Sequence, residues 1–521
     1  MESTAFFLLF LVVAVAGFSS LARLVGVPYP ILLVLGGLVL GLVPGVPEIE
    51  LEPDLVFLLF LPPLLYSAAF FASLRDLRAD ARAITLLALG LVLVTTAAVA
   101  VVARALLPGL PWPVAVALGA IISPTDPVAA TAVMRRLGAP RRIVTIVEGE
   151  SLVNDASAIV VYRAAVAAAV GGGVSWWEAG LQLPLGLLGG VAIGLVVGLA
   201  IAELRRRLDD PPVEIAISLV TGYAAYLPAE QLHVSGVLAA VTAGIVVGWR
   251  GPEIAEARTR LEAFSVWTVV VFLANALLFI LVGLQLPLVL RGVAGQDVAQ
   301  AVGVALAVAA VVIAVRLVWG YTTPYVVRAL DRRPSQVARR ADWRARTVVA
   351  WSGMRGAVSM AAALALPLAI PERGLLIFIA FVVVLVTLVL QGLTLPALIA
   401  RLGVHDDGAE QREELRARRE TAEAALTRLD ELAREGWPRE DTVERMRGLY
   451  EFRRHRVAVR AGDEPDDGTD GRSLAYQRII REVLVAQRHR LVSLRNDGTI
   501  SSDVMHRVER ELDLEDSRLE I

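Results

Sequence analysis

Apolar stretches long enough to cross a bilayer, separated by short polar loops, fill the first 402 residues of the chain. About 20 consecutive apolar residues span the hydrocarbon core of a membrane as an α-helix. Thirteen such windows can be placed, at 5–22, 28–45, 53–71, 83–107, 112–136, 142–170, 183–204, 212–228, 232–249, 262–288, 297–326, 344–368 and 373–402. The pattern therefore predicts an all-α polytopic membrane protein with about 13 transmembrane helices.

The pattern changes at about residue 403. The stretch 403–521 is dense in Arg, Glu and Asp, and its apolar residues recur at helical spacing. We expect a soluble, mostly helical tail at 403–521 that follows a transmembrane domain at 1–402.

Composition narrows the class of protein. The 521 residues are 56% hydrophobic, against about 45–50% in soluble globular chains, so membrane lipid must cover the excess. A net charge of −2 gives no reason to expect a nucleic-acid partner. The chain has no Cys and no H-E-x-x-H pair, which argues against thiolate chemistry and an intramembrane metalloprotease. We therefore predict no enzyme activity and no cofactor.

The loops between the windows alternate in charge. One alternate set carries nearly all the loop arginines, whereas the other set holds only Arg104, Arg291 and Arg373. Because arginine-rich loops stay in the cytoplasm, we predict a multi-pass protein of the cell (plasma or inner) membrane. Its N-terminus would lie outside and its tail in the cytoplasm.

Ionisable side chains lie inside the apolar windows, where each is costly unless it is paired or hydrated. They are Asp126, Glu148, Glu150, Asp155, Arg163, Arg316 and Arg355. Structural ion pairs could explain any one of them. The fifth and sixth windows, however, hold four carboxylates against one arginine. Some of these acids must therefore be paired elsewhere, protonated, or in contact with a hydrated cation.

The fifth and twelfth windows contain helix breakers. In Ser123–Pro127 two prolines remove backbone donors, and in Gly353–Ser359 two glycines flank Arg355. Broken backbone at membrane depth lines a cavity or is buried in protein. The freed carbonyls of Ser123–Pro127 and the Thr125 hydroxyl are oxygen ligands that suit a hard cation. The alternative interpretation of these prolines is a simple kink in a continuous helix. The two windows cross in opposite directions, which predicts inverted repeats formed by spans 1–6 and 8–13.

The sixth window carries the candidate exchange site. On a helix Glu148, Ser151 and Asp155 share one face, and Asn154 lies beside it. A buried carboxylate next to an amide and a hydroxyl can hold a proton or a small cation, but not both at once. Competition of this kind is the minimal physical basis of antiport.

The buried arginines need acidic partners because a guanidinium keeps its charge at accessible pH. For Arg355 we predict Glu150 as the first choice and Glu148 as the second. The sequence does not assign partners to Arg163 and Arg316.

These motifs make the chain similar to the cation:proton antiporter-1 family, the Na⁺/H⁺ exchangers that include the prokaryotic NhaP-type proteins. The matching strings are SPTDP at Ser123–Pro127, GESLVNDA at Gly149–Ala156 and GMRGAVS at Gly353–Ser359, with weaker matches at Ser235–Ala239 and Leu61–Phe70. Relatives often carry an acid where this chain has Ser67. The resemblance implies a thirteen-helix inverted-repeat fold with two crossed broken helices, assembled as a homodimer.

The resemblance also implies roles for individual residues. Asp155 would be the carboxylate that binds the exchanged ion, and Asn154 would support it. Thr125 and Ser151 would be oxygen ligands of the transported metal ion. Asp126 would balance the broken-helix ends, and Glu150 with Arg355 would form a buried ion pair. The family's Asn-Asp pair suggests electroneutral exchange of one cation per proton.

The predicted function is secondary active exchange of Na⁺ (or Li⁺) for H⁺ by alternating access, which would serve pH homeostasis. The expected partners are a monovalent cation, membrane lipid and a second copy of the chain. K⁺/H⁺ exchange is one alternative that the same ligands support. A membrane sensor that binds ions and signals through the tail is an alternative from another class, and a uniport channel would differ by conducting current.

Overall fold

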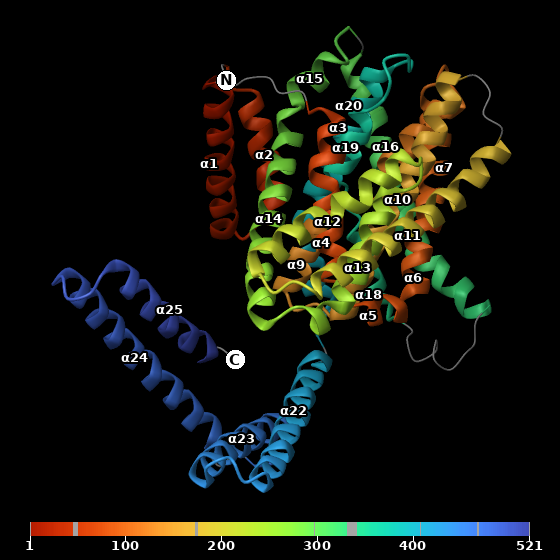
Figure 1. Ribbon diagram of the computed structural model, residues 1–521. Coiled ribbons are helices and arrows are strands. Elements are labelled where there is room, and N and C mark those ends of the chain that lie inside the picture. The colour runs from red at the N-terminus through yellow and green to blue at the C-terminus, as the bar shows by residue number, and fades with distance from the viewer. Residues whose placement is uncertain are drawn as a thin grey trace. The chain divides into compact units, whose positions relative to one another are not determined.

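The computed structural model describes residues 2–44, 51–171, 176–295, 297–330, 341–406, 408–465 and 468–519. Throughout these residues the regular structure is helical, without a strand (Figure 1). The predicted all-α class is therefore confirmed. The chain separates into two compact units, Met1–His405 and Asp406–Ile521.

The described part of the first unit is a bundle of α-helices interspersed with three π-helical segments, η1 to η3. In chain order its elements are α1 (Glu2–Val25), α2 (Tyr29–Gly41), α3 (Pro53–Leu55), η1 (Val56–Phe60), α4 (Leu61–Phe70), α5 (Leu74–Ala79), α6 (Ala81–Thr85), η2 (Leu86–Leu91), α7 (Val92–Leu106), α8 (Trp112–Ile122), α9 (Val128–Arg136), α10 (Arg141–Gly171), α11 (Trp176–Arg205), α12 (Pro211–Gln231), α13 (Gly236–Ile254), α14 (Ala257–Leu284), α15 (Leu286–Arg291), α16 (Val298–Leu330), α18 (Trp343–Trp351), α19 (Ala357–Leu364), α20 (Arg373–Val386), η3 (Thr387–Gln391) and α21 (Gly392–Leu402).

Each of the thirteen predicted windows contains a helix or a run of consecutive helices. By length and composition, eight helices among the described residues could cross a membrane, and three shorter apolar helices accompany them. The number of helices that cross the bilayer, and the internal repeat, stay predictions.

Small residues let neighbouring helices of the first unit approach closely. A Cβ on Gly37 of α2 would lie 2.2 Å from the Ile280 carbonyl of α14, and a Cβ on Gly283 of α14 would lie 2.2 Å from the Val34 carbonyl of α2. Contacts of this kind replace the hydrophobic effect, which supplies little attraction between helices in lipid. They fix the backbone that surrounds the interrupted helices.

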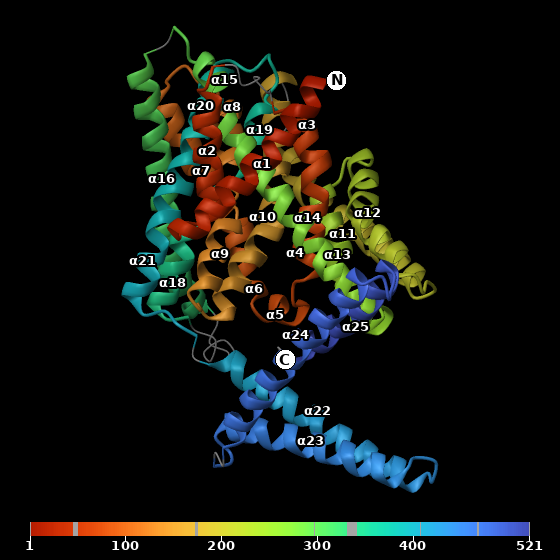
Figure 2. The same ribbon diagram turned by 90° about the vertical axis from the view of Figure 1, so that its left-hand side faces the viewer.

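The two interrupted helices run in opposite directions through the bundle. In Figure 2, α8 and α19 lie toward the upper end and α9 and α18 toward the lower end. The chain therefore descends through α8 and α9 and rises through α18 and α19. This arrangement confirms the predicted pair of crossed, broken helices in the fifth and twelfth windows.

The described residues of the second unit form four helices, α22 (Ala409–Arg434), α23 (Glu440–Ala461), α24 (Thr469–Asn496) and α25 (Ser502–Leu519). Helices α24 and α25 pack through a small apolar core of Leu484, Leu491, Met505 and Leu512. That this unit is a soluble tail in the cytoplasm stays a prediction.

Candidate ion-binding site

Two non-helical segments cross at the centre of the candidate site. Helix α8 ends at Ile122 and α9 begins at Val128, while α18 ends at Trp351 and α19 begins at Ala357. The predicted proline and glycine breakers lie in these two gaps. The Asp126 N–H donates to the Met354 carbonyl at 2.8 Å, so the two segments satisfy each other's backbone at the crossing.

Asp126 lies against the starts of both second halves. Its Oδ1 accepts a 2.9 Å hydrogen bond from the Val128 N–H at the start of α9. A Cβ on Gly356, which precedes α19, would lie only 1.9 Å from Asp126 Oδ2. Helix N-termini carry partial positive charge, which a carboxylate stabilises. The close approach explains why residue 356 is a glycine, and the role of Asp126 stays a prediction.

Arg355 lies against the C-terminal ends of the two first halves, α8 and α18. Its Nε donates to the Ile122 carbonyl at the end of α8 at 3.0 Å, and its Nη1 donates to the Gly353 carbonyl just after α18. Its backbone N–H donates to Thr387 Oγ1 in η3 at 3.1 Å. Helix C-termini carry partial negative charge and unpaired carbonyls, which a guanidinium satisfies.

The predicted ion pair between Glu150 and Arg355 is wrong in its partner. Glu150 of α10 binds Arg316 of α16 through both guanidinium nitrogens, with Nη2 to Oε2 at 2.7 Å and Nη1 to Oε1. Both side chains are almost fully buried. Arg355 needs no carboxylate of its own because helix-end carbonyls occupy its guanidinium.

Glu148, the second predicted partner of Arg355, is also paired elsewhere. It binds Arg135 at 2.7 Å and remains 35% exposed. It therefore joins α9 to the start of α10 and lies outside the buried network. The apolar window 142–170 includes Glu148 because hydropathy alone does not distinguish a charge near a helix end from a charge at the membrane midplane.

A buried hydrogen-bond network joins the ion pair to the broken helix. Thr125 Oγ1 donates to Glu150 Oε1 at 2.9 Å and accepts from Asn154 Nδ2 at 3.0 Å. Asn154 Nδ2 also donates to the Thr125 carbonyl at 3.3 Å. Asn154 is fully buried, and its Oδ1 lacks a hydrogen-bond partner within the part of the chain that the structure describes.

Asp155 follows Asn154 on α10 and is 7% exposed. Within the described ranges no hydrogen bond or ion pair reaches its carboxylate. Ser151 lies one turn earlier and is also buried. Asp126 is close enough to interact electrostatically with Asp155. The described residues hold no cluster of three or more His, Cys, Asp or Glu that could bind a metal.

Other partners of the site helices were missing from the sequence interpretation. Ser157 Oγ of α10 donates to the Ala88 carbonyl in η2 at 2.7 Å, and π-helical turns leave such carbonyls available. Arg163 of α10 pairs with Glu230 of α12 at 2.6 Å. The lone charge of Arg316 in an apolar window signalled a buried partner, but no sequence pattern identifies which acid it meets.

Comparison with known proteins gives consistent results. A family profile described as the transmembrane sodium/hydrogen exchanger matches residues 8–401. An uncharacterized Na⁺/H⁺ exchanger of Mycobacterium tuberculosis is 38% identical over 499 residues, which cover 94% of this chain and 91% of the relative. The Na⁺/H⁺ antiporter ApNhaP of Aphanothece halophytica is 35% identical over 409 residues, covering 78% and 75%.

Two further proteins bear on substrate and fold. A sodium, potassium, lithium and rubidium/H⁺ antiporter of Bacillus pumilus is 34% identical over 389 residues, covering 71% of this chain and 58% of the relative. The solved structure of the sodium proton antiporter MjNhaP1 from Methanocaldococcus jannaschii matches with a TM-score of 0.61 at 19% identity, covering 77% of this chain and 99% of that one. The chain belongs to the sodium/hydrogen exchanger family.

Proposed function

We propose that the protein exchanges Na⁺ for H⁺ across the membrane, with Asp155 as the shared site. The observation that carries the proposal is that the other buried charges have partners, whereas Asp155 has no basic partner among the described residues. Glu150, Arg316 and Arg355 are committed to one another or to helix ends, whereas no described basic group pairs with Asp155. A buried carboxylate without a counter-charge is costly, and a proton or a monovalent cation removes that cost.

Neutral oxygens beside Asp155 support cation binding. Both hydrogen bonds recorded for the Asn154 side chain are made by Nδ2, which leaves Oδ1 as an unused buried acceptor. An unsatisfied buried acceptor costs about 1–3 kcal/mol, and a bound cation would recover this energy. Ser151 and the carbonyl of Thr125 are further candidate ligands, and the remainder of the shell would be water.

A single exchangeable carboxylate favours electroneutral exchange of one cation per proton. Asp126 is occupied at the starts of α9 and α19, so it supports the site without binding the exchanged ion directly. The loaded site then has the same charge with either ligand. We propose that α10 and the interrupted helices move as one part against a scaffold in a homodimer, in alternating access. The empty, charged site would cross poorly.

The cation itself is the least restricted part of the proposal. The same ligands could accept K⁺ or Li⁺, and the printed name of the Bacillus pumilus relative includes both ions. We favour Na⁺ because the family description and the Aphanothece relative name it. A physiological role in pH homeostasis and a location in the cell membrane, with the tail in the cytoplasm, follow from this proposal.

The test is cation-driven proton movement in proteoliposomes that contain a pH-sensitive dye. Na⁺, Li⁺ and K⁺ are titrated side by side with wild type, Asp155→Asn and the matched control Glu148→Gln, which also neutralises an acid of α10. We expect Asp155→Asn to lose exchange and Glu148→Gln to keep it. An imposed membrane potential should leave the wild-type rate unchanged. Exchange by Asp155→Asn at the wild-type rate would contradict the proposal.

A further inference from the structure

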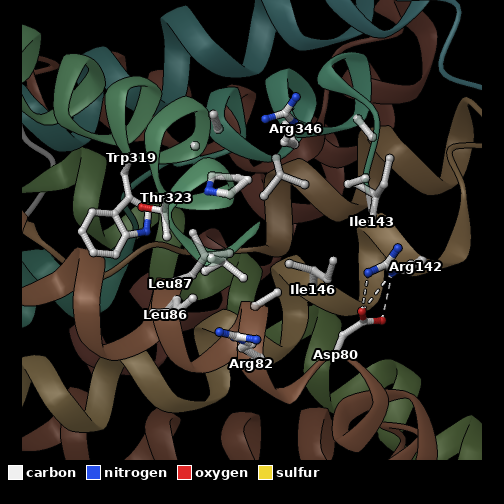
Figure 3. Close-up of a pocket in the computed structure, with 18 of the residues that line it drawn as sticks. Asp80, Arg82, Leu86, Leu87, Arg142, Ile143, Ile146, Trp319, Thr323 and Arg346 are labelled. Atoms are coloured by element: carbon white, nitrogen blue, oxygen red, sulfur yellow. Dashed lines mark hydrogen bonds and ion pairs between the residues drawn. The ribbon is translucent and has the colours of Figure 1, made fainter. Parts of the chain in front are cut away.

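A cavity lies away from Asp155, at the end of the bundle where α6, α10, α16 and α18 meet. Its volume is about 320 Å³, within the range of about 300–1,000 Å³ that is usual for ligand pockets. Most of its wall is apolar, with Leu87 and Trp319 on one side and Ile143 and Ile146 on the other (Figure 3). Asp155 and Asn154 do not line it.

Arginines from all four helices line this cavity. They are Arg82, Arg142, Arg316, Arg328 and Arg346, and the accompanying acid is Asp80. Asp80 is bound by Arg142, whose Nη2 lies 2.6 Å from Oδ1 (Figure 3). Arg316 is neutralised by Glu150, as Arg142 is by Asp80, so Arg328 and Arg346 carry the positive excess of the lining beside its apolar wall.

Two of these arginines have buried nitrogens without protein acceptors in the described residues. They are Nε and Nη1 of Arg346 and Nε of Arg316, whose side chain is 1% exposed. Buried N–H groups are normally satisfied, so each such group needs an acceptor. The guanidinium of Arg346 also lies over the Tyr325 ring, 5.4 Å from its centroid, which fixes its orientation at the cavity.

We propose that this cavity binds an anionic phospholipid, with its phosphate at Arg346 and one acyl chain along the apolar wall. A phosphate supplies strong acceptors for guanidinium groups. The apolar acyl chain matches the apolar side chains of Leu87, Ile143 and Ile146. Basic pockets between transmembrane helices on the cytoplasmic side bind lipid headgroups in this way, and the arginine-rich loops predict that this end faces the cytoplasm.

The site has a direct structural connection to the exchange site. Arg316 is one of the residues that line the cavity, and it holds Glu150 with its two terminal nitrogens. Glu150 in turn accepts from Thr125. A lipid that joins α6, α10, α16 and α18 would therefore stabilise the helices that position Thr125 and Asn154.

The experiment measures the melting temperature of the full-length protein in detergent with added lipid. The probes are phosphatidylglycerol, phosphatidylcholine of the same chains, and inorganic phosphate. We expect phosphatidylglycerol to raise the melting temperature by about 2 °C or more, and the other two probes to leave it unchanged. Arg346→Gln should weaken the apparent lipid affinity by about tenfold or more, as expected for loss of a charge-assisted bond.

Two further variants separate the cavity from general surface charge. Arg344→Gln removes the same charge from the same helix, but Arg344 does not line the cavity, so its lipid response should equal that of wild type. Ala83→Phe keeps every arginine and fills the apolar wall, so its response should be lost. A single size-exclusion peak and the melting temperature without added lipid verify that each variant is folded.

Three results would overturn the proposal. Equal stabilisation of Arg346→Gln and wild type would remove the phosphate contact, and equal stabilisation by phosphatidylcholine would remove the requirement for charge. Stabilisation by inorganic phosphate that depends on Arg346 would show a soluble anion site in place of a lipid site. None of these results depends on whether Asp155 exchanges Na⁺, so the two proposals fail separately.

Discussion

Replacing Glu150 with Gln should destabilise the transmembrane unit, because it leaves a buried guanidinium without its counter-charge. The side chains of Arg316 and Glu150 are 1% and 2% exposed, and two hydrogen bonds join them. Removing one partner of a buried ion pair costs about 3–5 kcal/mol. The Thr125 hydroxyl can still donate to the Gln oxygen, so the lost charge sets the magnitude. We expect Glu150→Gln to lower the free energy of unfolding by about 3–5 kcal/mol.

The partner assignment is tested by a double-mutant cycle. Arg316→Met should cost a similar amount, because it leaves a buried carboxylate unpaired. With both changes the site holds no uncompensated charge, so the double variant should be more stable than the sum of the single effects predicts, by about 1–3 kcal/mol. The free energies are measured by titrating the protein in mixed micelles with a denaturing detergent and following tryptophan fluorescence.

A parallel cycle with Arg355→Met provides the control. Arg355 donates to the Ile122 and Gly353 carbonyls, so its loss should add to that of Glu150→Gln with a much smaller coupling energy. The reasoning is refuted if Glu150 couples strongly to Arg355 while its effect adds independently to that of Arg316.

Two further predictions follow from the crossing and from the shared carboxylate. Gly356→Ala should lower the free energy of unfolding by about 1–3 kcal/mol through overpacking and reduce exchange, because the new Cβ would meet Asp126. The control Gly303→Ala lies on a helix with open space around its Cβ and should not be destabilising in the same detergent titration. Equal losses of stability in the two variants would contradict the contact between residue 356 and Asp126. The Na⁺ concentration for half-maximal exchange should rise as pH falls, because Na⁺ and H⁺ compete for Asp155. The rise should reach about tenfold per pH unit when H⁺ occupies most sites. Proteoliposome titrations at several pH values measure this concentration, and a constant value across the acid range would exclude competition.

The interrupted helices could be predicted because their cause is local. Proline removes a backbone donor and glycine weakens a helix wherever it occurs, so the breaks lie where Ser123–Pro127 and Gly353–Gly356 indicated. The proximity of Asn154 to Asp155 on one buried helix is local in the same way. Long apolar windows identified the helices for the same reason, since a bilayer requires a fixed length of apolar chain.

The partners of the buried charges could not be predicted because they depend on tertiary distances. The sequence analysis paired Arg355 with Glu150 or Glu148 and assigned no partner to Arg316, and only the packing of α16 against the core brings Arg316 to Glu150. The role of Arg355 at the helix ends was missed for another reason. Carbonyls of broken helices compete with carboxylates for a guanidinium, and a search for acidic partners overlooks them.

The most direct test of the central claim is proton release when Na⁺ binds to the purified protein. In weakly buffered detergent solution at a pH where Asp155 is protonated, a pH indicator follows the addition of NaCl against choline chloride. The account predicts that wild type releases about one proton per bound Na⁺ and that Asp155→Asn releases none. Undiminished Na⁺-dependent proton release from Asp155→Asn would contradict it.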